Sequence, residues 1–296
     1  MEISAYPLPY VPCDFLETSY ELDSFAEPEE ENTQRVIYFF TPRHHDAVKP
    51  AIKDVVKGPD ATKAGFICSS EVVYSNVNRD PIIDVTGDMA AYIRFYDHPR
   101  MQVYPLGSPE ALSVNPDDVK CVFLFGSRQW NGELRGRCAD LSLGVRVHEK
   151  FFNNLLDDNE LVLSRLRNVP VIGGEPTRPS LSVSPRGFIV TGGRFEVSSV
   201  HVEDERSAGQ KFHQLKEAVD ACARRMYRPK SFGFVFGAFG SFMRHESHYM
   251  STDMWRKLQN EFPFTQFIGC ATECVYTDVH TKLEKVTLVS IVTIDD

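Results

Sequence analysis

The chain has 296 residues, of which 42% are hydrophobic and 25% are charged, and its formal net charge is −9. This composition is typical of a globular protein, and the absence of any run of about eighteen apolar residues predicts that no segment spans a membrane. The whole negative excess lies in residues 1–34, so the body of the protein, residues 35–296, is neutral. A neutral body does not attract a polyanion, and we therefore expect no nucleic-acid binding.

The acidic segment at the start, residues 1–34, contains nine acidic residues, no Lys or Arg, and four prolines. Its charge and its prolines both oppose independent folding, so we predict a flexible tail. Its aromatic side chains, such as Tyr6 and Phe25, suit anchoring on a protein partner. A solubilising extension that lies partly on the body of the protein is the alternative interpretation, and the sequence leaves both open.

Three apolar runs in the body have the β-branched and aromatic residues of strands that are buried on both faces. They are Val36–Phe40, Cys121–Phe125 and Phe232–Phe236. Each is followed by apolar residues at helical spacing, which predicts helices from about residue 46, over about residues 152–166, and from Thr252.

Each predicted helix is followed by a short strand that ends in small residues and a glutamate. These strands are Gly65–Glu71, Val171–Glu175 and Phe267–Glu273. A strand, a helix and a second strand in this order predict a βαβ unit with a right-handed crossover. The sequence therefore predicts three such units.

Alternating apolar and polar residues predict antiparallel strands between these units, at Met89–Phe95, Met101–Tyr104, Gly187–Thr191, Arg194–Val202 and Val286–Ile294. Helical spacing predicts one further helix over about residues 207–227. Turn-forming residues at 105–119 divide the body into two similar halves, residues 35–118 and 119–296. The predicted fold class is α/β, with repeated βαβ units and mixed sheets in two halves, preceded by the acidic tail.

The glutamates at the ends of the three short strands are the best candidate site. Ligands of parallel sheets bind beyond the carboxyl ends of the strands, and small residues let the backbone approach a ligand there. Glu175 and Glu273 could hold a ligand amine, next to Gly173, Gly174 and Gly269. In the alternative interpretation Glu71 and Glu175 cap the following turn and stay solvated.

Other motifs carry less chemistry. Gly240 completes a glycine-rich exit from the third strand; close packing explains it better than phosphate binding, although we keep it as a ligand-binding candidate. The sequence His245–His248 is one residue short of a zinc-protease motif and favours a loop surface. Cys68 and Cys270 hold matching positions at strand ends, where packing is the more common role than a reactive thiol.

The seven scattered cysteines indicate reduced thiols, and so a cytoplasmic or nuclear location. Cys270 and Cys274 have no second pair nearby, so we expect no metal and no cofactor. No nucleophile, base and oxyanion set can be assembled from the sequence, which favours a protein that is not an enzyme.

Five segments carry a resemblance to a known family: VKCVFLFG, PVIGGE, RGFIVTGGRFEVSSVHV, SFGFVFGAFG and FPFTQFIGCATE, which begin at residues 119, 170, 186, 231 and 262. They resemble the FIST family (F-box and intracellular signal transduction), in particular its C-terminal part. The match is good over about residues 119–296 and thin over 35–118.

Two departures from the family matter. The Gly-Glu-Ile-Gly turn of the family is shortened here to Thr272–Val275, and no Leu-rich F-box is found, because residues 1–34 are acidic and rich in proline. The resemblance implies a recognition module or adaptor in ubiquitin-dependent protein turnover, with ligase components and a substrate protein as partners. A sensory domain for a small, amino-acid-like ligand in intracellular signalling is the alternative that it implies.

Overall fold

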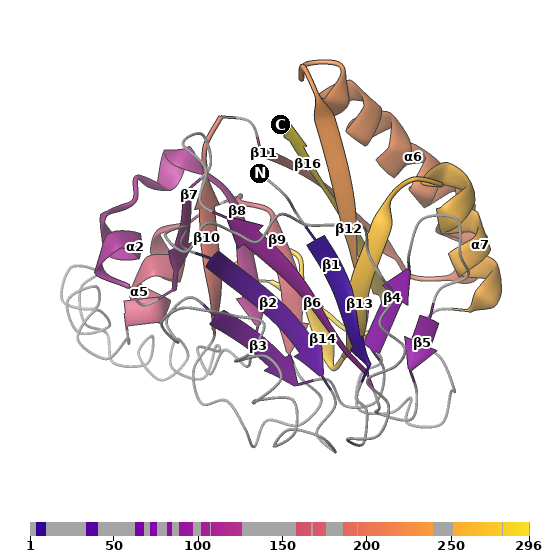
Figure 1. The fold of residues 1–296 in the computed structure, drawn as a ribbon, viewed down its shortest axis with the longest axis horizontal. Coiled ribbons are helices and arrows are strands. Elements are labelled where there is room, and N and C mark those ends of the chain that lie inside the picture. Colours follow the sequence, from indigo (N-terminus) through magenta and orange to yellow (C-terminus); the bar gives the residue numbers. More distant parts are fainter. Residues whose placement is uncertain are drawn as a thin grey trace, which may run out of the picture.

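The computed structural model describes rather more than half of the chain, with side chains described from residue 102 onward. The described ranges are 4–9, 34–40, 63–67, 72–75, 82–84, 89–96, 102–106, 108–125, 158–166, 168–175, 186–193, 195–238, 251–279 and 281–295. The described strands form three sheets, and the described helices lie at their sides (Figure 1).

The first sheet has four strands in the order β1-β6-β2-β3. Their bounds are Ser4–Pro9 for β1, Gln34–Phe40 for β2, Lys63–Ile67 for β3 and Met89–Tyr96 for β6. β2 and β3 are parallel, and β6 pairs antiparallel with both β2 and β1.

The second sheet has six strands in the order β15-β14-β9-β8-β10-β7. Their bounds are Gln102–Pro105 for β7, Val119–Phe125 for β8, Val171–Glu175 for β9, Arg186–Thr191 for β10, Cys274–Tyr276 for β14 and Lys282–Leu283 for β15. β8 and β9 are parallel, and the other neighbours are antiparallel.

The third sheet has six strands in the order β11-β16-β12-β13-β4-β5. Their bounds are Val72–Ser75 for β4, Ile82–Asp84 for β5, Phe195–Val202 for β11, Pro229–Ala238 for β12, Gln266–Thr272 for β13 and Thr287–Asp295 for β16. β12 and β13 are parallel, and the remaining pairs are antiparallel.

One pairing pattern is common to the three sheets. A parallel pair (β2 with β3, β8 with β9, β12 with β13) is bordered by an antiparallel strand that follows it in the chain, namely β6, β10 or β16. This arrangement confirms the predicted α/β class with repeated units and mixed sheets; a helix joins the parallel pair in the second and third units, and the helix predicted from about residue 46 lies outside the described residues. The units also exchange strands: β4 and β5 follow β3 but extend the third sheet, and β14 and β15 follow β13 but extend the second.

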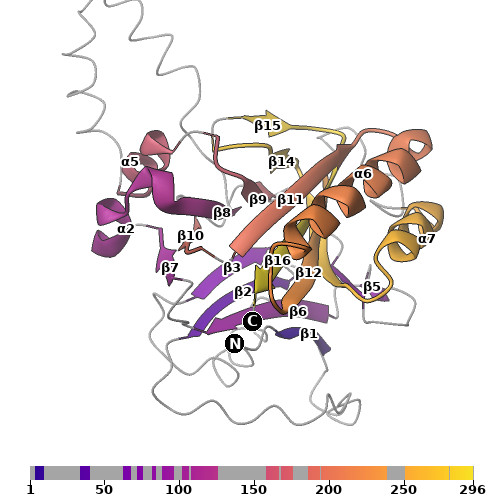
Figure 2. The same ribbon diagram turned by 90° about the horizontal axis from the view of Figure 1, so that it is seen from above.

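Helices cover the outer sides of the second and third sheets. α6 (Glu205–Ala223) and α7 (Thr252–Glu261) pack on the third sheet, and α2 (Pro109–Ser113) and α5 (Asp158–Arg165) lie beside the second (Figure 2). Side-chain caps start these helices: the Asp204 carboxylate accepts from two backbone N–H groups of α6, and the Ser251 hydroxyl accepts from Met254. The N-cap of α7 is therefore Ser251, one residue before the predicted start.

Residues 105–119 were predicted as a turn-rich linker, and the structure differs there. Ser108 caps α2, and a 3-10 helix, η3 (Pro116–Asp118), follows with Asn115 as its cap. Both elements start with a proline in the first turn, where its missing N–H has no cost. Turn-forming residues here begin short helices.

The main core lies between the second and third sheets and is rich in phenylalanine. Phe123 contacts Phe234 with ring centroids 5.4 Å apart, and Phe125 contacts Phe236 at 6.2 Å. The predicted apolar face of the last strand, which includes Leu288 and Ile294, belongs to this core. In the strands of the third sheet, the residues that alternate with these core residues face α6 and α7 and form a second core around Trp255.

Part of the acidic segment, residues 4–9, lies on the body of the protein, as in the alternative interpretation of this segment. These residues form β1, which pairs along its full length with β6, from Ser4 opposite Arg94 to Pro9 opposite Met89. β1 is an edge strand, a position in a sheet where prolines such as Pro7 and Pro9 are tolerated. The remainder of residues 1–34 lies outside the described residues.

Candidate functional site

The structure brings two of the predicted glutamate turns together. β14 pairs antiparallel with β9, so Cys274 lies opposite Glu175, and the backbone N–H of Glu273 donates to the Glu175 carbonyl at 2.9 Å. Glu71, Gly240, Cys68 and the segment His245–His248 lie outside the described residues. The candidate site therefore consists of the ends of β9 and β13 and the hairpin of β14 and β15.

Glu175 is buried, and its carboxylate is bound by groups of the same chain. The Tyr276 hydroxyl donates to Oε1 at 3.0 Å, and the Lys282 ammonium donates to Oε2 at 3.1 Å. A carboxylate at this strand end was predicted to hold the amine of a ligand. In the structure an amine of the protein itself, that of Lys282, takes this role.

The charges in this cluster shift two pKa values. Burial and the nearby Glu175 carboxylate raise the pKa of the Cys274 thiol to about 12. Burial alone would lower the pKa of Lys282, but the hydrogen bond and the charge of Glu175 outweigh it and raise the pKa. Cys274 is therefore a protonated, unreactive thiol near neutral pH, because the thiolate is the nucleophilic form.

The predicted glycines lie where neighbouring strands touch. A Cβ atom on Gly269 would be 1.7 Å from the carbonyl oxygen of Val235, and one on Gly174 would be 2.3 Å from that of Cys274. Gly173 has a φ of +145° and would meet the Leu124 carbonyl oxygen at 1.9 Å. Close packing of strands thus requires glycine at these positions, with backbone in the place predicted for a ligand.

A cleft that the sequence did not point to lies between the second and third sheets. Its volume is about 380 Å³, and its described walls come from the start of β9, the turn after β14, and the inner face of β11 and β16. The described residues that line it are Asn168, Val169, Pro170, Val171, Val197, Ser199, His201, Thr277, Asp278 and Leu288. We refer to it as the His201 cleft.

His201 is the unusual group of this cleft. Its Nε2 atom is buried and has no hydrogen-bond partner among the described residues. Burial, and to a smaller extent the charge of Lys211, lower the pKa of the imidazole, against an opposing effect of Glu203. The ring is therefore neutral near pH 7, and a buried nitrogen without a partner costs about 1–3 kcal/mol unless a ligand or a water completes its bonding.

A pattern in the sequence could have revealed the cleft. Phe195, Val197, Ser199 and His201 alternate along β11 and so share one face of the strand. Phe195 lies in the core between the sheets, Val197 packs against that core at the edge of the cleft, and Ser199 and His201 line the cleft beyond it. A strand face that changes from apolar to polar partway along marks the place where the core ends.

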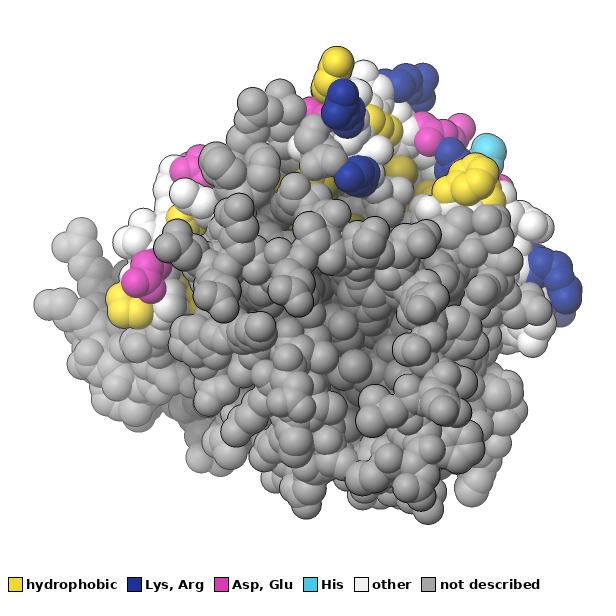
Figure 3. Space-filling view, viewed as in Figure 1, with side chains coloured by type: hydrophobic (Ala, Val, Ile, Leu, Met, Phe, Trp, Pro, Cys, Tyr) yellow, Lys and Arg dark blue, Asp and Glu magenta, His cyan; other side chains and the backbone are white. Residues whose placement is uncertain are grey.

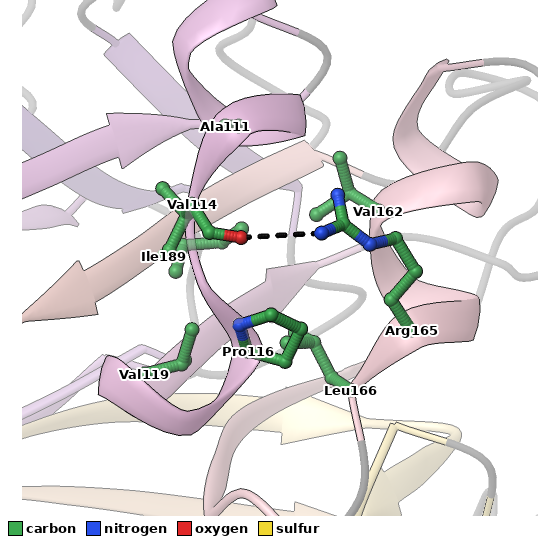
Figure 4. A pocket seen from close by; sticks show the side chains of 8 residues that line it. All are labelled: Ala111, Val114, Pro116, Val119, Val162, Arg165, Leu166 and Ile189. Atoms are coloured by element: carbon green, nitrogen blue, oxygen red, sulfur yellow. Dashed lines mark hydrogen bonds between the residues drawn. The ribbon is translucent and has the colours of Figure 1, made fainter.

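A second hollow, next to α2 and α5, is closed by packing. Its lining is mainly apolar, and its side chains leave no space for a water-sized molecule. Figure 4 shows Arg165 reaching from α5 to the Val114 carbonyl, at 3.4 Å; its other terminal nitrogen donates to the Leu112 carbonyl. This hollow lies where α2 and α5 pack together, and it has no room for a ligand.

Basic residues gather at the turn from α6 to β12, where Figure 3 shows Lys and Arg side chains near an exposed apolar one. Tyr227 is 79% exposed there, with the Arg228 guanidinium 5.5 Å from its ring centroid, and Phe264 is 78% exposed after α7. Of the described helices, none has the length and apolar character needed to cross a membrane. The described His, Cys, Asp and Glu residues form no group that could hold a metal ion.

Comparison with known proteins gives distant structural likenesses only. No family model and no curated protein matches the chain. One similar solved structure is the cyanuric acid hydrolase from A. caulinodans, with a TM-score of 0.40, 8% identity, and coverage of 88% of this chain and 90% of that one. A second cyanuric acid hydrolase, described as an evolutionary innovation by structural concatenation, has a TM-score of 0.42 and 8% identity, and 99% of each chain is covered.

These findings correct the predicted function. Both of these structures are described as hydrolases and neither as a ubiquitin adaptor, so the prediction of a FIST-type recognition module in ubiquitin-dependent protein turnover is corrected. Likenesses at this identity and TM-score assign no activity to the chain. The resemblance to the FIST family itself stays a prediction, because no family model matches.

Proposed function

We propose that this protein binds a small polar molecule in the His201 cleft. The buried Nε2 of His201 has no partner among the described residues, and His201 lines a cleft of about 380 Å³. Binding sites for small molecules combine apolar walls with a few polar groups that fix orientation. The His201 cleft has this composition, with Val197 and Leu288 beside Thr277 and Asp278.

The position of the cleft supports the proposal. The second and third sheets pack against each other through large phenylalanine side chains. The cleft lies where the smaller and polar residues Ser199 and His201 take the place of these side chains. The walls are held by hydrogen bonds, because the backbone N–H of Thr277 donates to Thr281 at 2.9 Å and the Ser199 hydroxyl pairs with that of Ser290 at 2.8 Å. Such walls are formed before a ligand arrives, which lowers the entropic cost of binding.

We propose binding without conversion of the ligand. A serine nucleophile needs a hydrogen bond to its base, but Ser199 is hydrogen-bonded to Ser290, and His201 Nε2 has no described partner.

Cys121, Cys222, Cys270 and Cys274 form no disulfide. This supports the expectation of a cytoplasmic or nuclear location.

The test is a screen of small polar molecules by thermal unfolding, followed by NMR of the imidazole signals. A ligand present at 100 times its Kd stabilises the protein by about 2.7 kcal/mol, which corresponds to a rise in Tm of several degrees. We expect the rise to vanish in His201→Leu and to persist in His213→Leu, since His213 lies on the exposed side of α6. A screen without any stabilising compound, or a rise that survives in His201→Leu, would overturn the proposal.

A further inference from the structure

The two large apolar side chains that are strongly exposed in the described part of the chain lie at the same end of the third sheet. Tyr227 is 79% exposed and precedes β12, and Phe264 is 78% exposed and precedes β13. β12 and β13 are parallel neighbours, so both strands begin at this end. We refer to this end as the Tyr227 surface, which consists of Arg224, Arg225, Tyr227, Arg228 and Phe264.

The backbone of the Tyr227 surface is held in place by hydrogen bonds. Oδ1 of the buried Asp295 accepts from the backbone N–H groups of Tyr227 and Arg228, both at 2.8 Å. The hydroxyls of Ser231 and Thr265 lie 3.4 Å apart and link the starts of β12 and β13. The surface is therefore formed before a partner arrives, which lowers the entropic cost of docking.

The Tyr227 surface is positively charged. Arg224, Arg225 and Arg228 are all exposed, and Figure 3 shows Lys and Arg side chains near exposed apolar ones at this end of the molecule. Their described contacts are a carbonyl oxygen, a sulfur atom and an aromatic ring, which belong to Asp220, Cys222 and Tyr227. None of these three groups is an anion, so the surface favours an acidic partner.

We propose that residues 10–33 of the same chain dock on the Tyr227 surface. This segment, which lies outside the described residues, contains eight acidic residues and no Lys or Arg, and aromatic residues such as Tyr20 and Phe25 alternate with the acids. Carboxylates pair with guanidinium groups in a bidentate manner. Aromatic side chains of the segment can cover Tyr227 and Phe264, so that its composition matches both the charge and the apolar part of the surface.

The two ends of the segment are held within reach of this surface. Residue 9 ends β1 and residue 34 begins β2, and β6 pairs with both of these strands. β1 and β6 each contact β13, whose length is about 24 Å. The middle of the segment is about twelve residues from either end and can extend about 40 Å. It can therefore reach the start of β13, where Phe264 lies.

Attachment to the same chain favours this segment over a separate polyanion. A segment on a short flexible linker has an effective concentration in the millimolar range. A free polyanion would have to displace it, and would approach a body, residues 35–296, that has no net charge. The preceding residues, 4–9, already pair with the body as β1.

The protease Glu-C, which cuts after glutamate, measures docking in the full chain, because a docked segment is protected. Mass spectrometry gives the rate of cleavage after Glu17 and Glu21 at low ionic strength, where exposed ion pairs are strongest. We expect the arginine variant, Arg224→Gln/Arg225→Gln/Arg228→Gln, to be cut at least about 10-fold faster than the wild type, because it loses three ion pairs.

Two further variants separate charge from apolar contact. Arg206→Gln/Lys211→Gln/Arg256→Gln removes the same charge from exposed positions of α6 and α7 and should keep the wild-type rate. Tyr227→Ser/Phe264→Ser keeps the charge and should be cut about 5-fold faster than the wild type, because apolar contact is lost. Far-ultraviolet circular dichroism and the Tm of each variant check that it is folded.

A carbodiimide cross-link, which joins an amine directly to a carboxyl group, locates the contact. Lys230 is an exposed amine next to the Tyr227 surface. We expect it to couple to a carboxyl group of residues 10–33 within a single chain, as shown by the mass of the cross-linked peptides and by migration as a monomer.

Several results would overturn the proposal. These are a wild-type cleavage rate in the arginine variant or the aromatic variant, equal rates in the arginine variant and its charge-matched control, and cross-links of residues 10–33 only to lysines other than Lys230. Cross-links to Lys230 that occur only in dimers would also overturn it, because the surface would then hold the acidic segment of a second copy.

Discussion

The β14–β15 hairpin lies beside two buried polar groups that differ in how they are satisfied. On one side, the Glu175 carboxylate has a hydroxyl and an ammonium of its own chain as partners. On the other, the turn of the hairpin helps to line the cleft of His201, whose buried Nε2 has no described partner. The Glu175 carboxylate, which has partners of its own chain, therefore has a structural role, whereas the His201 imidazole, at the wall of a cleft, leaves a hydrogen bond for a ligand to make.

The largest expected effect comes from separating the strands that hold Glu175 in place. In Gly174→Ala the new Cβ meets the Cys274 carbonyl oxygen at 2.3 Å, so β9 and β14 must move apart. We expect a loss of about 3 kcal/mol in the free energy of unfolding, measured in urea. Gly209→Ala is the control: nothing lies within 4 Å of its Cβ, and alanine in a helix should stabilise α6 by up to about 1 kcal/mol. Equal effects of the two changes would contradict the close contact.

The second largest effect is expected from removing the Lys282 ammonium, which pairs with the Glu175 carboxylate. Lys282→Met removes the ammonium that pairs with the buried Glu175 carboxylate, and we expect a loss of about 2 kcal/mol in the free energy of unfolding, a figure reduced because Lys282 is 38% exposed. The control is Lys257→Met: Lys257 is similarly exposed, at 35%, but its partner Asp253 is 51% exposed. That surface pair should contribute less than about 1 kcal/mol. A similar loss in both variants would show that burial of Glu175 does not matter.

Alkaline pH tests the same cluster through Cys274. The pKa of this thiol is raised in the folded protein from 9.0 to about 12, so the folded state favours the protonated form. Its contribution to stability is full below pH 9 and is lost as the pH rises towards 12. We expect the free energy of unfolding to fall less steeply between pH 9 and 11 in Cys274→Ala than in the wild type. Cys222→Ala, on α6, is the control and should keep the wild-type slope.

The smallest effect is expected at His201. Its pKa is lowered in the folded protein, so its contribution to stability is present above pH 6.5 and is lost as the pH falls through the folded value. The loss should stay below about 1 kcal/mol, because the ring is partly exposed. His201→Leu should remove this part of the pH dependence between pH 7 and 5. NMR titration should give His201 a lower pKa than an ordinary histidine, and a higher one would contradict its burial.

The sequence predicts the fold better than it predicts the site. The strands around Phe123 and Phe234 were predicted to within a few residues, because a strand buried on both faces has a continuous apolar run. Glu175 was predicted to end a strand, and it does. Its partner Lys282 lies 107 positions away and reaches it only through the β9–β14–β15 pairing, which no local pattern specifies.

The His201 cleft could not be predicted for a similar reason. Its walls come from segments near residues 168, 197, 277 and 288, which the sheet packing brings together. A single polar histidine on a predicted strand is common, and its meaning depends on what covers it. The change from Val197 to Ser199 on one strand face was the only local trace of the cleft.

The exchange of strands between units has a consequence for how the protein is made. β4 belongs to the first unit, yet it pairs with β13, with Ser75 opposite Phe267. The third sheet therefore cannot be completed until residues near the end of the chain have been synthesised. During synthesis the early hairpin of β4 and β5 emerges long before this partner exists. Long-range pairing of this kind slows folding, and it also means that a fragment cut between residues 118 and 119 leaves both pieces with an unpaired sheet edge. We therefore expect the three units to fold together and not one by one.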